Sequence, residues 1–333
     1  MNRPEDPDRF NGALASSGKP RHYAFLLMPE FSMMAFTASI EPLRAANRMQ
    51  QAELYSWRTI TVDGEPVAAS NGVTILPDSS LAQLSDADAI VVCAGLNAYD
   101  YADNASIAPL RKAAGRGIAL GSVCTGTVIL AKAGLLDGHR CTIHWEDIES
   151  FAENFPNLEV TSRLYEVDRN RFTCSGGTAP LDLMIHFIAR DFGDDLAVRV
   201  ADQMLHHYTR KASEPQRLPL AERTGVRHLG LLDALAQMEG QLENPVALPV
   251  IAVRAGLSLR QLERLFDTLL GTTPTRYYRE MRLNKARHLV TRTAMPLAQI
   301  AMACGFSSPS HFARSYREAF GTAASEDRLV AAH

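Results

Sequence analysis

Cys124 is the residue of this chain whose surroundings best suit chemistry. It follows the apolar stretch 117–121 and directly precedes the run 126–131, with a glycine on either side of the turn. This pattern predicts a strand that turns straight into a helix, a nucleophile elbow, which holds the thiol at a helix N-terminus where the dipole favours a thiolate. His144 is the candidate base for such a thiol.

Three interpretations of Cys124 are open at this level: a ligand-pocket residue, a catalytic nucleophile, or inert packing. A cysteine is a useful catalyst only beside an oriented base and an oxyanion site. Nothing in the sequence places His144 beside the thiol. We therefore favour the ligand-pocket interpretation and expect no enzymatic activity.

The second set of candidate functional residues lies in two helix-turn-helix patterns near the C-terminus. Gly256 and Gly305 occupy the two turns, 305 − 256 = 49 residues apart, and the helical stretch 274–287 joins the units. Between residues 246 and 320, eleven Lys/Arg stand against four Asp/Glu, a local balance of +7 in a chain of net charge −3. Basic charge is thus concentrated where two such units would bind DNA.

The second helix of each unit should carry the residues that read DNA, because its N-terminal end enters the major groove. Arg matches guanine and Gln matches adenine. The predicted DNA-binding residues are Arg260, Gln261, Arg264, Ser310, His311 and Arg314. The predicted core residues of the same helices are Leu259, Leu262, Leu265, Phe266, Phe312 and Tyr316. For a single arginine, a solvated helix face is an equally good interpretation.

The elements that must position Cys124 alternate between strand and helix. Strands are expected at 23–27, 57–62, 73–76, 89–93 and 117–121, a hairpin at 164–168 and 171–174, and helices at 33–49, 104–115, 145–155, 181–192 and 194–208. Thr178 is the predicted N-cap of the helix 181–192. The alternation predicts an α/β domain with a mostly parallel sheet covered on both faces, which binds ligands beyond the carboxyl ends of its strands.

A length of 333 residues suits two domains. We expect a disordered tail over 1–21, a ligand-binding and dimerisation domain over 22–209, a linker over 210–225 and an all-α DNA-binding domain over 226–328. The five cysteines are widely spaced and include no Cys-x-x-Cys pair, so neither a disulfide framework nor a zinc site is indicated. No metal and no cofactor are expected. No signal peptide or membrane span is evident, and the cytoplasm is the expected location.

The paired units resemble the DNA-binding domain of the AraC/XylS family of transcription regulators, in which one long helix bridges two helix-turn-helix units. That family often has Pro and Tyr after the Phe-Gly, where this chain has the stretch 322–328. The elbow, with 133–145 and 40–44, resembles the PfpI-like branch of the class I glutamine amidotransferase-like fold. Hydrolytic relatives often have His directly after the Cys, and Thr125 stands there in this chain.

A PfpI-like domain followed by an AraC-type domain is typical of a group of bacterial regulators. The stretches 41–48 and 172–182 most resemble members that respond to carnitine, glycine betaine and related methylated amines, with arginine regulators as cousins. The resemblance implies a homodimeric activator that binds a small-molecule inducer, promoter DNA and RNA polymerase. The alternatives are a Cys124-dependent amidase or glyoxalase-type enzyme with a regulatory DNA-binding tail, and a constitutive repressor whose first domain only dimerises.

Aromatic faces and a carboxylate would together hold a quaternary ammonium near the elbow. The predicted ligand-binding residues are Phe36, Glu41, Cys124, Thr125, His144 and Trp145. Core packing is the competing interpretation for Phe36 and Trp145, and a purely structural role is the competing one for His144.

Overall fold

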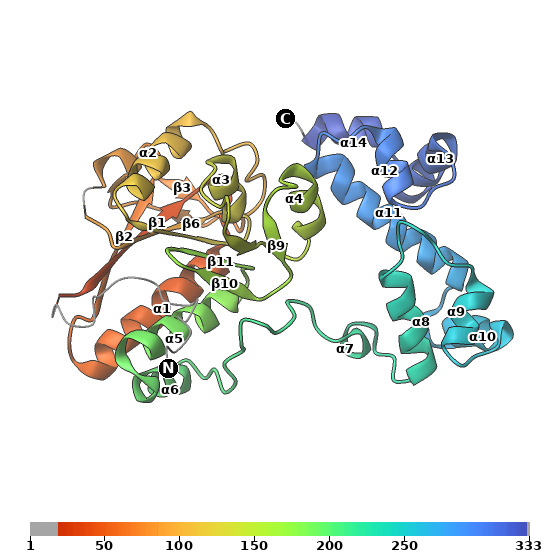
Figure 1. The fold of residues 1–333 in the computed structure, drawn as a ribbon, viewed down its shortest axis with the longest axis horizontal. Coiled ribbons are helices and arrows are strands. Elements are labelled where there is room, and N and C mark those ends of the chain that lie inside the picture. Colours follow the sequence, from red (N-terminus) through yellow and green to blue (C-terminus); the bar gives the residue numbers. More distant parts are fainter. Residues whose placement is uncertain (1–18, 85, 332–333) are drawn as a thin grey trace, which may run out of the picture. The chain divides into compact units, whose positions relative to one another are not determined.

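The chain folds into two compact units, which divide after Gln216 in the computed structural model (Figure 1). The structure describes residues 19–84 and 86–331. Residues 1–18 of the predicted tail lie outside this description, whereas Arg21 already begins the first strand. The division falls within the stretch 210–225 that the sequence predicts as a linker.

A seven-stranded sheet forms the centre of the first unit, counted over the described residues, in the order β10-β11-β7-β6-β1-β2-β5. Its strands are β1 (Arg21–Leu27), β2 (Tyr55–Thr61), β5 (Ser79–Ser80), β6 (Ala89–Cys93), β7 (Ala119–Val123), β10 (Tyr165–Asp168) and β11 (Arg171–Cys174). All neighbouring strands are parallel except the β10–β11 hairpin. The predicted parallel α/β sheet is confirmed.

Side chains alternate between two cores along β1. Tyr23 and Phe25 point into one core, and Ala24 and Leu26 into the other. The first core is covered by α1 (Met33–Gln50), α5 (Ala179–Phe192) and α6 (Asp194–Gln203), and the second by α2 (Asn104–Gly115) and α3 (Gly126–Lys132). Figure 1 shows these helices as layers on the two faces of the sheet. Because both faces are buried, the strands are apolar throughout.

Smaller elements complete the first unit. They are β3 (Val67–Ala68), β4 (Thr74–Ile75), η1 (Leu81–Gln83), β8 (Arg140–Thr142), α4 (Ile148–Asn154) and β9 (Glu159–Thr161). The strand expected at 73–76 therefore does not join the main sheet, because β4 pairs only with β3. The strand expected at 117–121 begins two residues later, since Gly117, with φ of +83°, still belongs to the turn after α2.

Three helix predictions are corrected at their ends. The helix expected from Trp145 begins only at Ile148, because 144–147 form a turn in which Asp147 N–H donates to the His144 carbonyl at 2.8 Å. The helix expected to reach 208 ends at Gln203, before a left-handed Leu205. Thr178 is the N-cap residue of α5, but its hydroxyl makes no capping bond.

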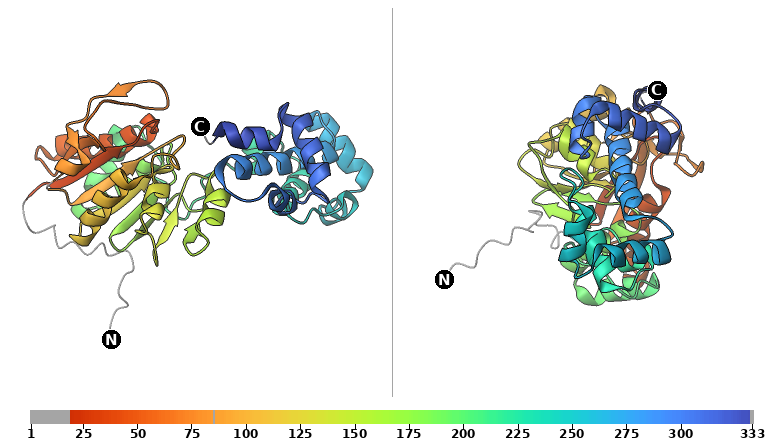
Figure 2. Two further views of the ribbon diagram at one scale, coloured as in Figure 1. Left: turned by 90° about the horizontal axis from the view of Figure 1, so that it is seen from above. Right: turned by 90° about the vertical axis from the view of Figure 1, so that its right-hand side faces the viewer.

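The second unit is helical (Figure 2). Its helices are α7 (Leu220–Thr224), α8 (Leu229–Glu239), α9 (Leu248–Arg254), α10 (Leu259–Leu270), α11 (Pro274–Arg292), α12 (Leu297–Ala303), α13 (Pro309–Phe320) and α14 (Ala324–Ala331). Helix α11 contributes Tyr278 to the core of the first helix-turn-helix unit and Leu283 to that of the second. The described helices include none long and apolar enough to cross a membrane.

The stretch 322–328, which departs from the family pattern, forms a helix of its own. Asp327 on α14 accepts hydrogen bonds from the Tyr316 hydroxyl at 2.7 Å and from Arg287 Nε at 3.0 Å. These bonds tie α14 to both α13 and α11. The departure therefore changes the sequence but leaves a closing helix in place.

Candidate functional site

Cys124 sits on a sharp turn between β7 and α3. Its φ is +57°, in the left-handed region, and its N–H donates to the Cys174 carbonyl at 2.9 Å. A Cβ on Gly176 would lie 2.8 Å from the Cys124 Cβ, and one on Gly126 would lie 2.2 Å from the Val92 carbonyl oxygen. Only glycine fits at these two positions. The predicted elbow geometry is confirmed.

The thiol at this elbow is neutral, contrary to the thiolate that the sequence predicts. Burial raises the pKa of Cys124 to about 11. Asp147 and Glu146 raise it further, and hydrogen bonds from Thr125 lower it only in part. At pH 7, roughly one molecule in ten thousand would carry the thiolate. Desolvation, the largest contribution to this shift, thus outweighs the effect of the helix N-terminus.

His144 and Trp145 lie in the turn that follows β8. The Nδ1 atom of His144 accepts from the Glu146 N–H at 3.4 Å and lies 3.7 Å from the Glu146 carboxylate. The His144 ring therefore faces Glu146, and no hydrogen bond between His144 and Cys124 occurs in the described part of the chain. Trp145 is 38% exposed and its ring centroid lies 5.7 Å from that of His144. Its indole is an accessible aromatic face, not a core side chain.

Phe36 and Glu41 both lie on α1. Phe36 is 6% exposed and packs in the core, with ring centroids 5.8 Å from Phe25 and 5.6 Å from Phe31. Glu41 lies eight residues along α1, about 12 Å from its first residue, and pairs with Arg44 at 2.6 Å on the helix surface. Phe36 is thus a core side chain, and the Glu41 carboxylate is engaged by Arg44.

Beside the predicted Thr125, polar residues that the sequence analysis missed lie at the same edge of the sheet, and they are Glu30 and Asn97. Thr125 Oγ1 donates to the Gly95 carbonyl after β6. Glu30, after β1, accepts from Asn97 Nδ2 at 2.9 Å and from the Tyr101 hydroxyl at 3.4 Å. Their only sequence signal is their position directly after buried strands. With Glu146 and Asp147, Glu30 gives this edge an acidic character.

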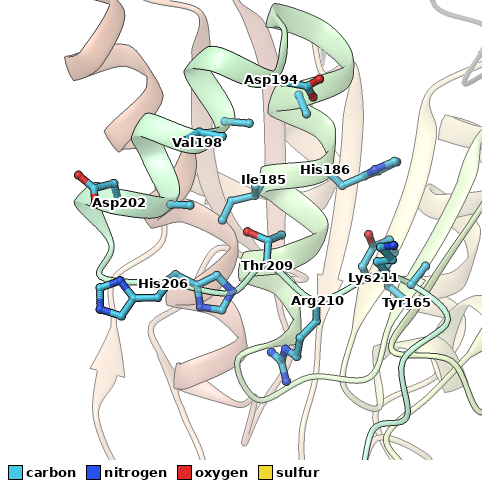
Figure 3. Close-up of a pocket in the computed structure, with 15 residues that line it drawn as sticks. Tyr165, Ile185, His186, Asp194, Val198, Asp202, His206, Thr209, Arg210 and Lys211 are labelled. Atoms are coloured by element: carbon cyan, nitrogen blue, oxygen red, sulfur yellow. The ribbon is translucent and has the colours of Figure 1, made fainter.

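A cavity of about 700 Å³ lies elsewhere in the first unit, between α5, α6 and the segment that follows them (Figure 3). Its lining includes Ile185, Val198 and Ala201 on the two helices, and His206 and Arg210 on the segment. None of the six predicted ligand residues lines it. We call it the α5–α6 cavity. Sequence reasoning missed it because one wall is an irregular segment without a periodic pattern.

The two helix-turn-helix units have well-defined helix starts. Ser258 caps α10, where its hydroxyl accepts from the Gln261 N–H at 3.3 Å, and Ser308 caps α13 in the same way from the His311 N–H at 3.2 Å. Pro309 occupies the first helical position. All six predicted DNA-binding residues are exposed: Arg260, Gln261, Arg264, Ser310, His311 and Arg314.

Some of these side chains already have partners. Gln261 Oε1 accepts from the Ser258 N–H at 2.8 Å, so bidentate pairing with adenine would require this capping bond to break. The His311 ring lies 5.7 Å from that of Phe306. Leu259, expected in the core, is 37% exposed, and Leu265 is only partly buried. The other predicted core residues, Leu262, Phe266, Phe312 and Tyr316, are buried.

Helix α11 joins the two helix-turn-helix units through Tyr278 and Arg282, which lie one helical turn apart. The Tyr278 hydroxyl donates to the Gln241 carbonyl at 2.6 Å, on the side of the first helix-turn-helix unit. Arg282 Nη1 donates to the Gly305 carbonyl at 2.9 Å, in the turn of the second helix-turn-helix unit. The Arg282 guanidinium also lies 5.0 Å from the centroid of Phe306. One helical turn of α11 therefore holds both helix-turn-helix units, and we call the pair Tyr278 and Arg282 the α11 joint.

Comparison with known proteins gives two family matches. The family described as helix-turn-helix domain matches residues 251–329, and the DJ-1/PfpI family matches residues 23–190. The HTH-type transcriptional regulator CdhR of Pseudomonas aeruginosa is 44% identical over 306 residues, which cover 92% of this chain and 91% of the relative. The HTH-type transcriptional regulator GbdR of the same species is 39% identical over 317 residues, covering 95% and 86%.

A solved structure resembles more than half of the chain. The crystal structure of an AraC family transcriptional regulator from Pseudomonas putida is 31% identical, with a TM-score of 0.51. The match covers 56% of this chain and 100% of that chain. Sequence and structure comparisons thus point to one family.

The neutral thiol predicts slow alkylation of Cys124 at neutral pH. Because only the thiolate reacts, the rate with iodoacetamide should rise about tenfold per pH unit between pH 7 and 10. Mass spectrometry of the intact protein measures this rate, with Cys124→Ala as the control that removes the reactive site. A rate that levels off below pH 8 would show a stabilised thiolate and contradict the burial argument.

The α11 joint predicts that removal of the Arg282 side chain lowers the stability of the DNA-binding part of the chain. Arg282→Ala should lower the free energy of unfolding of the second unit by about 1–3 kcal/mol, since a hydrogen bond and an aromatic contact are lost together. Arg276→Ala, which removes an exposed guanidinium paired with Glu280 on the surface of the same helix, should have a much smaller effect. Urea denaturation of the full chain followed by circular dichroism compares them. Equal effects of the two substitutions would rule out the joint.

Proposed function

Because this chain belongs to the family of transcriptional regulators that join a DJ-1/PfpI domain to an AraC-type helix-turn-helix domain, we propose that it controls transcription in response to a methylated amine such as carnitine or glycine betaine. The regulator function rests on the exposed, basic starts of α10 and α13. The choice of ligand is supported by the resemblance of 41–48 and 172–182 to regulators that respond to these metabolites, and by the acidic edge of the sheet.

The ligand site in this proposal is the edge of the sheet beside Cys124. The exposed indole of Trp145 offers an aromatic face, and Glu146 and Asp147 lie close enough to raise the pKa of the thiol. A quaternary ammonium is attracted to such a face and to carboxylates. Thr125 and His144 complete the set. Phe36 and Glu41 support the site less well, because one is in the core and the other pairs with Arg44.

The α5–α6 cavity is the second candidate for this ligand site. Its volume of about 700 Å³ falls within the usual range of small-molecule pockets, about 300–1,000 Å³. Asp194 and Asp202 line it together with Arg210 and Lys211, so the lining could meet both the cationic and the carboxylate group of such a ligand. The two candidates are separable by substitution, because no residue is shared between them.

Catalysis by Cys124 is the alternative that the geometry favours least. Its thiol has a raised pKa, and the described contacts direct His144 to Glu146. An activated cysteine requires an adjacent base or a lowered pKa. Neither is supported here, so we propose that the enzyme-like fold serves as a sensor without turnover.

The mode of action that we propose is that of a homodimeric activator. Each protomer would present α10 and α13 to successive major grooves of promoter DNA, and a dimer would address two such half-sites. Ligand binding in the first unit would favour one arrangement of the dimer and so alter its affinity for DNA and its contact with RNA polymerase. The protein would act in the cytoplasm.

The ligand proposal predicts a thermal shift that depends on Trp145. Carnitine or glycine betaine at about 100 times its dissociation constant should stabilise the full chain by about 2.7 kcal/mol. Trp145→Ala should reduce this shift at a fixed ligand concentration, whereas Ala201→Phe, which adds a ring at a partly buried position of the α5–α6 cavity lining, should leave it unchanged. Differential scanning fluorimetry measures both variants. The reverse pattern would move the site to the α5–α6 cavity, and no shift with either metabolite would reject the ligand.

The DNA proposal predicts a loss of sequence preference at single positions. Arg264→Ala or Arg314→Ala should cost about 1–3 kcal/mol on a duplex selected from a random pool by the wild-type chain, and much less on an unrelated duplex. Arg58→Ala, an exposed arginine of the first unit, serves as the matched control. Fluorescence anisotropy at one fixed salt concentration gives the affinities. An equal loss of affinity on both duplexes would show that these arginines contact phosphates and do not read bases.

A further inference from the structure

The segment 204–216 is the last part of the first unit, and we call it the exit strap. It is fixed at its start by Asp182, a carboxylate of α5 that is fully buried. Asp182 accepts from His206 Nε2 at 2.7 Å, from the Arg210 N–H at 2.7 Å, and from Arg210 Nη2 at 2.6 Å. Arg210 Nη2 also donates to the Thr178 hydroxyl at 2.8 Å. Charge-assisted bonds to a buried carboxylate make this a strong anchor.

The exit strap then runs beside the start of β10. The Leu164 N–H donates to the Ala212 carbonyl at 2.9 Å, and Pro215 forms a β-bridge with Arg163. At its end the side chain of Gln216 turns into the protein. Gln216 Nε2 lies 3.0 Å from Thr142 Oγ1, 3.0 Å from the Ile143 carbonyl and 2.9 Å from the Arg163 carbonyl. This is the second anchor.

The second anchor is weaker than the first. The amide nitrogen of Gln216 carries two hydrogens and faces three acceptors, so one contact is always incomplete. Gln216 Oε1 is buried and accepts no hydrogen bond from the described residues. All its bonds are neutral, and an unmet buried acceptor offsets part of their gain. The two anchors therefore differ in strength, and the Gln216 end is the one that can open.

The Gln216 anchor contacts the same loop that carries the proposed ligand residues. Thr142 and Ile143 directly precede His144 and Trp145 in the chain. On the other side, Gln216 is the last residue of the first unit, and Arg217 begins the second. A shift of the Ile143 carbonyl would therefore reach the connection to the DNA-binding unit through a single side chain.

We propose that the exit strap is a ligand-operated latch, with Gln216 as its release point. In the ligand-free chain Gln216 holds the strap on Thr142, Ile143 and Arg163. A ligand bound beside His144 and Trp145 displaces the Ile143 carbonyl, the Gln216 anchor opens, and the Asp182 anchor keeps the rest of the strap in place. The freed stretch after Ala212 then lengthens the linker to the DNA-binding unit. This inference rests on the proposed sensor function and adds its route of regulation.

Reciprocal coupling makes the latch measurable in the full-length protein. If ligand binding must open the Gln216 anchor, a variant that has lost the anchor binds ligand more tightly, because it no longer has to break these bonds. Gln216→Ala should tighten the binding of glycine betaine or carnitine by about two- to tenfold, as expected for one net hydrogen-bonded group. It should also speed amide exchange over 212–218 without ligand. Gln203→Ala, an exposed glutamine of the first unit, should change neither.

Titration calorimetry measures the ligand affinity, and hydrogen-exchange mass spectrometry measures the amide exchange. A second variant, Gln216→Glu, removes both donors but keeps the side-chain length, and it should behave like Gln216→Ala. The latch is overturned if ligand affinity is unchanged or weaker in both variants while the wild type binds. If the wild type binds neither metabolite, the proposed ligand is wrong and DNA affinity decides. The latch then stands if Gln216→Ala, unlike Gln203→Ala, changes binding to the selected duplex, and falls if it does not.

Discussion

Two-sided burial of the parallel sheet is the constraint on which the first unit depends. Alternate residues of β1 enter two separate cores, so helices must cover both faces and every crossover returns the chain to the same edge. That edge brings together the elbow at Cys124, the loop after β6 and the turn at His144. Burial also sets the chemistry there, because the desolvation that stabilises the fold keeps the thiol neutral.

A comparable constraint shapes the second unit, where two small cores share one helix. Neither core is large, and α11 supplies buried residues to both. Tyr278 and Arg282 lie one turn apart on that helix. Tyr278 bonds to Gln241, earlier in the chain, and Arg282 bonds to Gly305, later in the chain, so each holds one helix-turn-helix unit. The separation of α10 and α13 therefore follows from one helix, which is what reading two grooves of one duplex requires.

Local patterns predicted much of this structure. The elbow and the hairpin depend on residues that are neighbours in sequence, and each was found where expected. Features that depend on distant residues were missed. Asp182 meets partners 24 and 28 residues away, and Gln216 meets a loop about 73 residues earlier. The neutral state of Cys124 was missed for the same reason, since burial is a property of the packed domain. Phe36 and Glu41 were grouped by residue type, and the structure places the first in the core and pairs the second with Arg44.

The central claim is that one small molecule bound to the first unit changes how the second unit binds DNA. The most direct test is the affinity of the full-length protein for its selected duplex, measured at fixed salt with and without saturating carnitine or glycine betaine. The account predicts a change of about 5- to 150-fold, the usual range of allosteric coupling, and an equal change in ligand affinity when DNA is bound. A DNA affinity that stays the same while the metabolite demonstrably binds would contradict it.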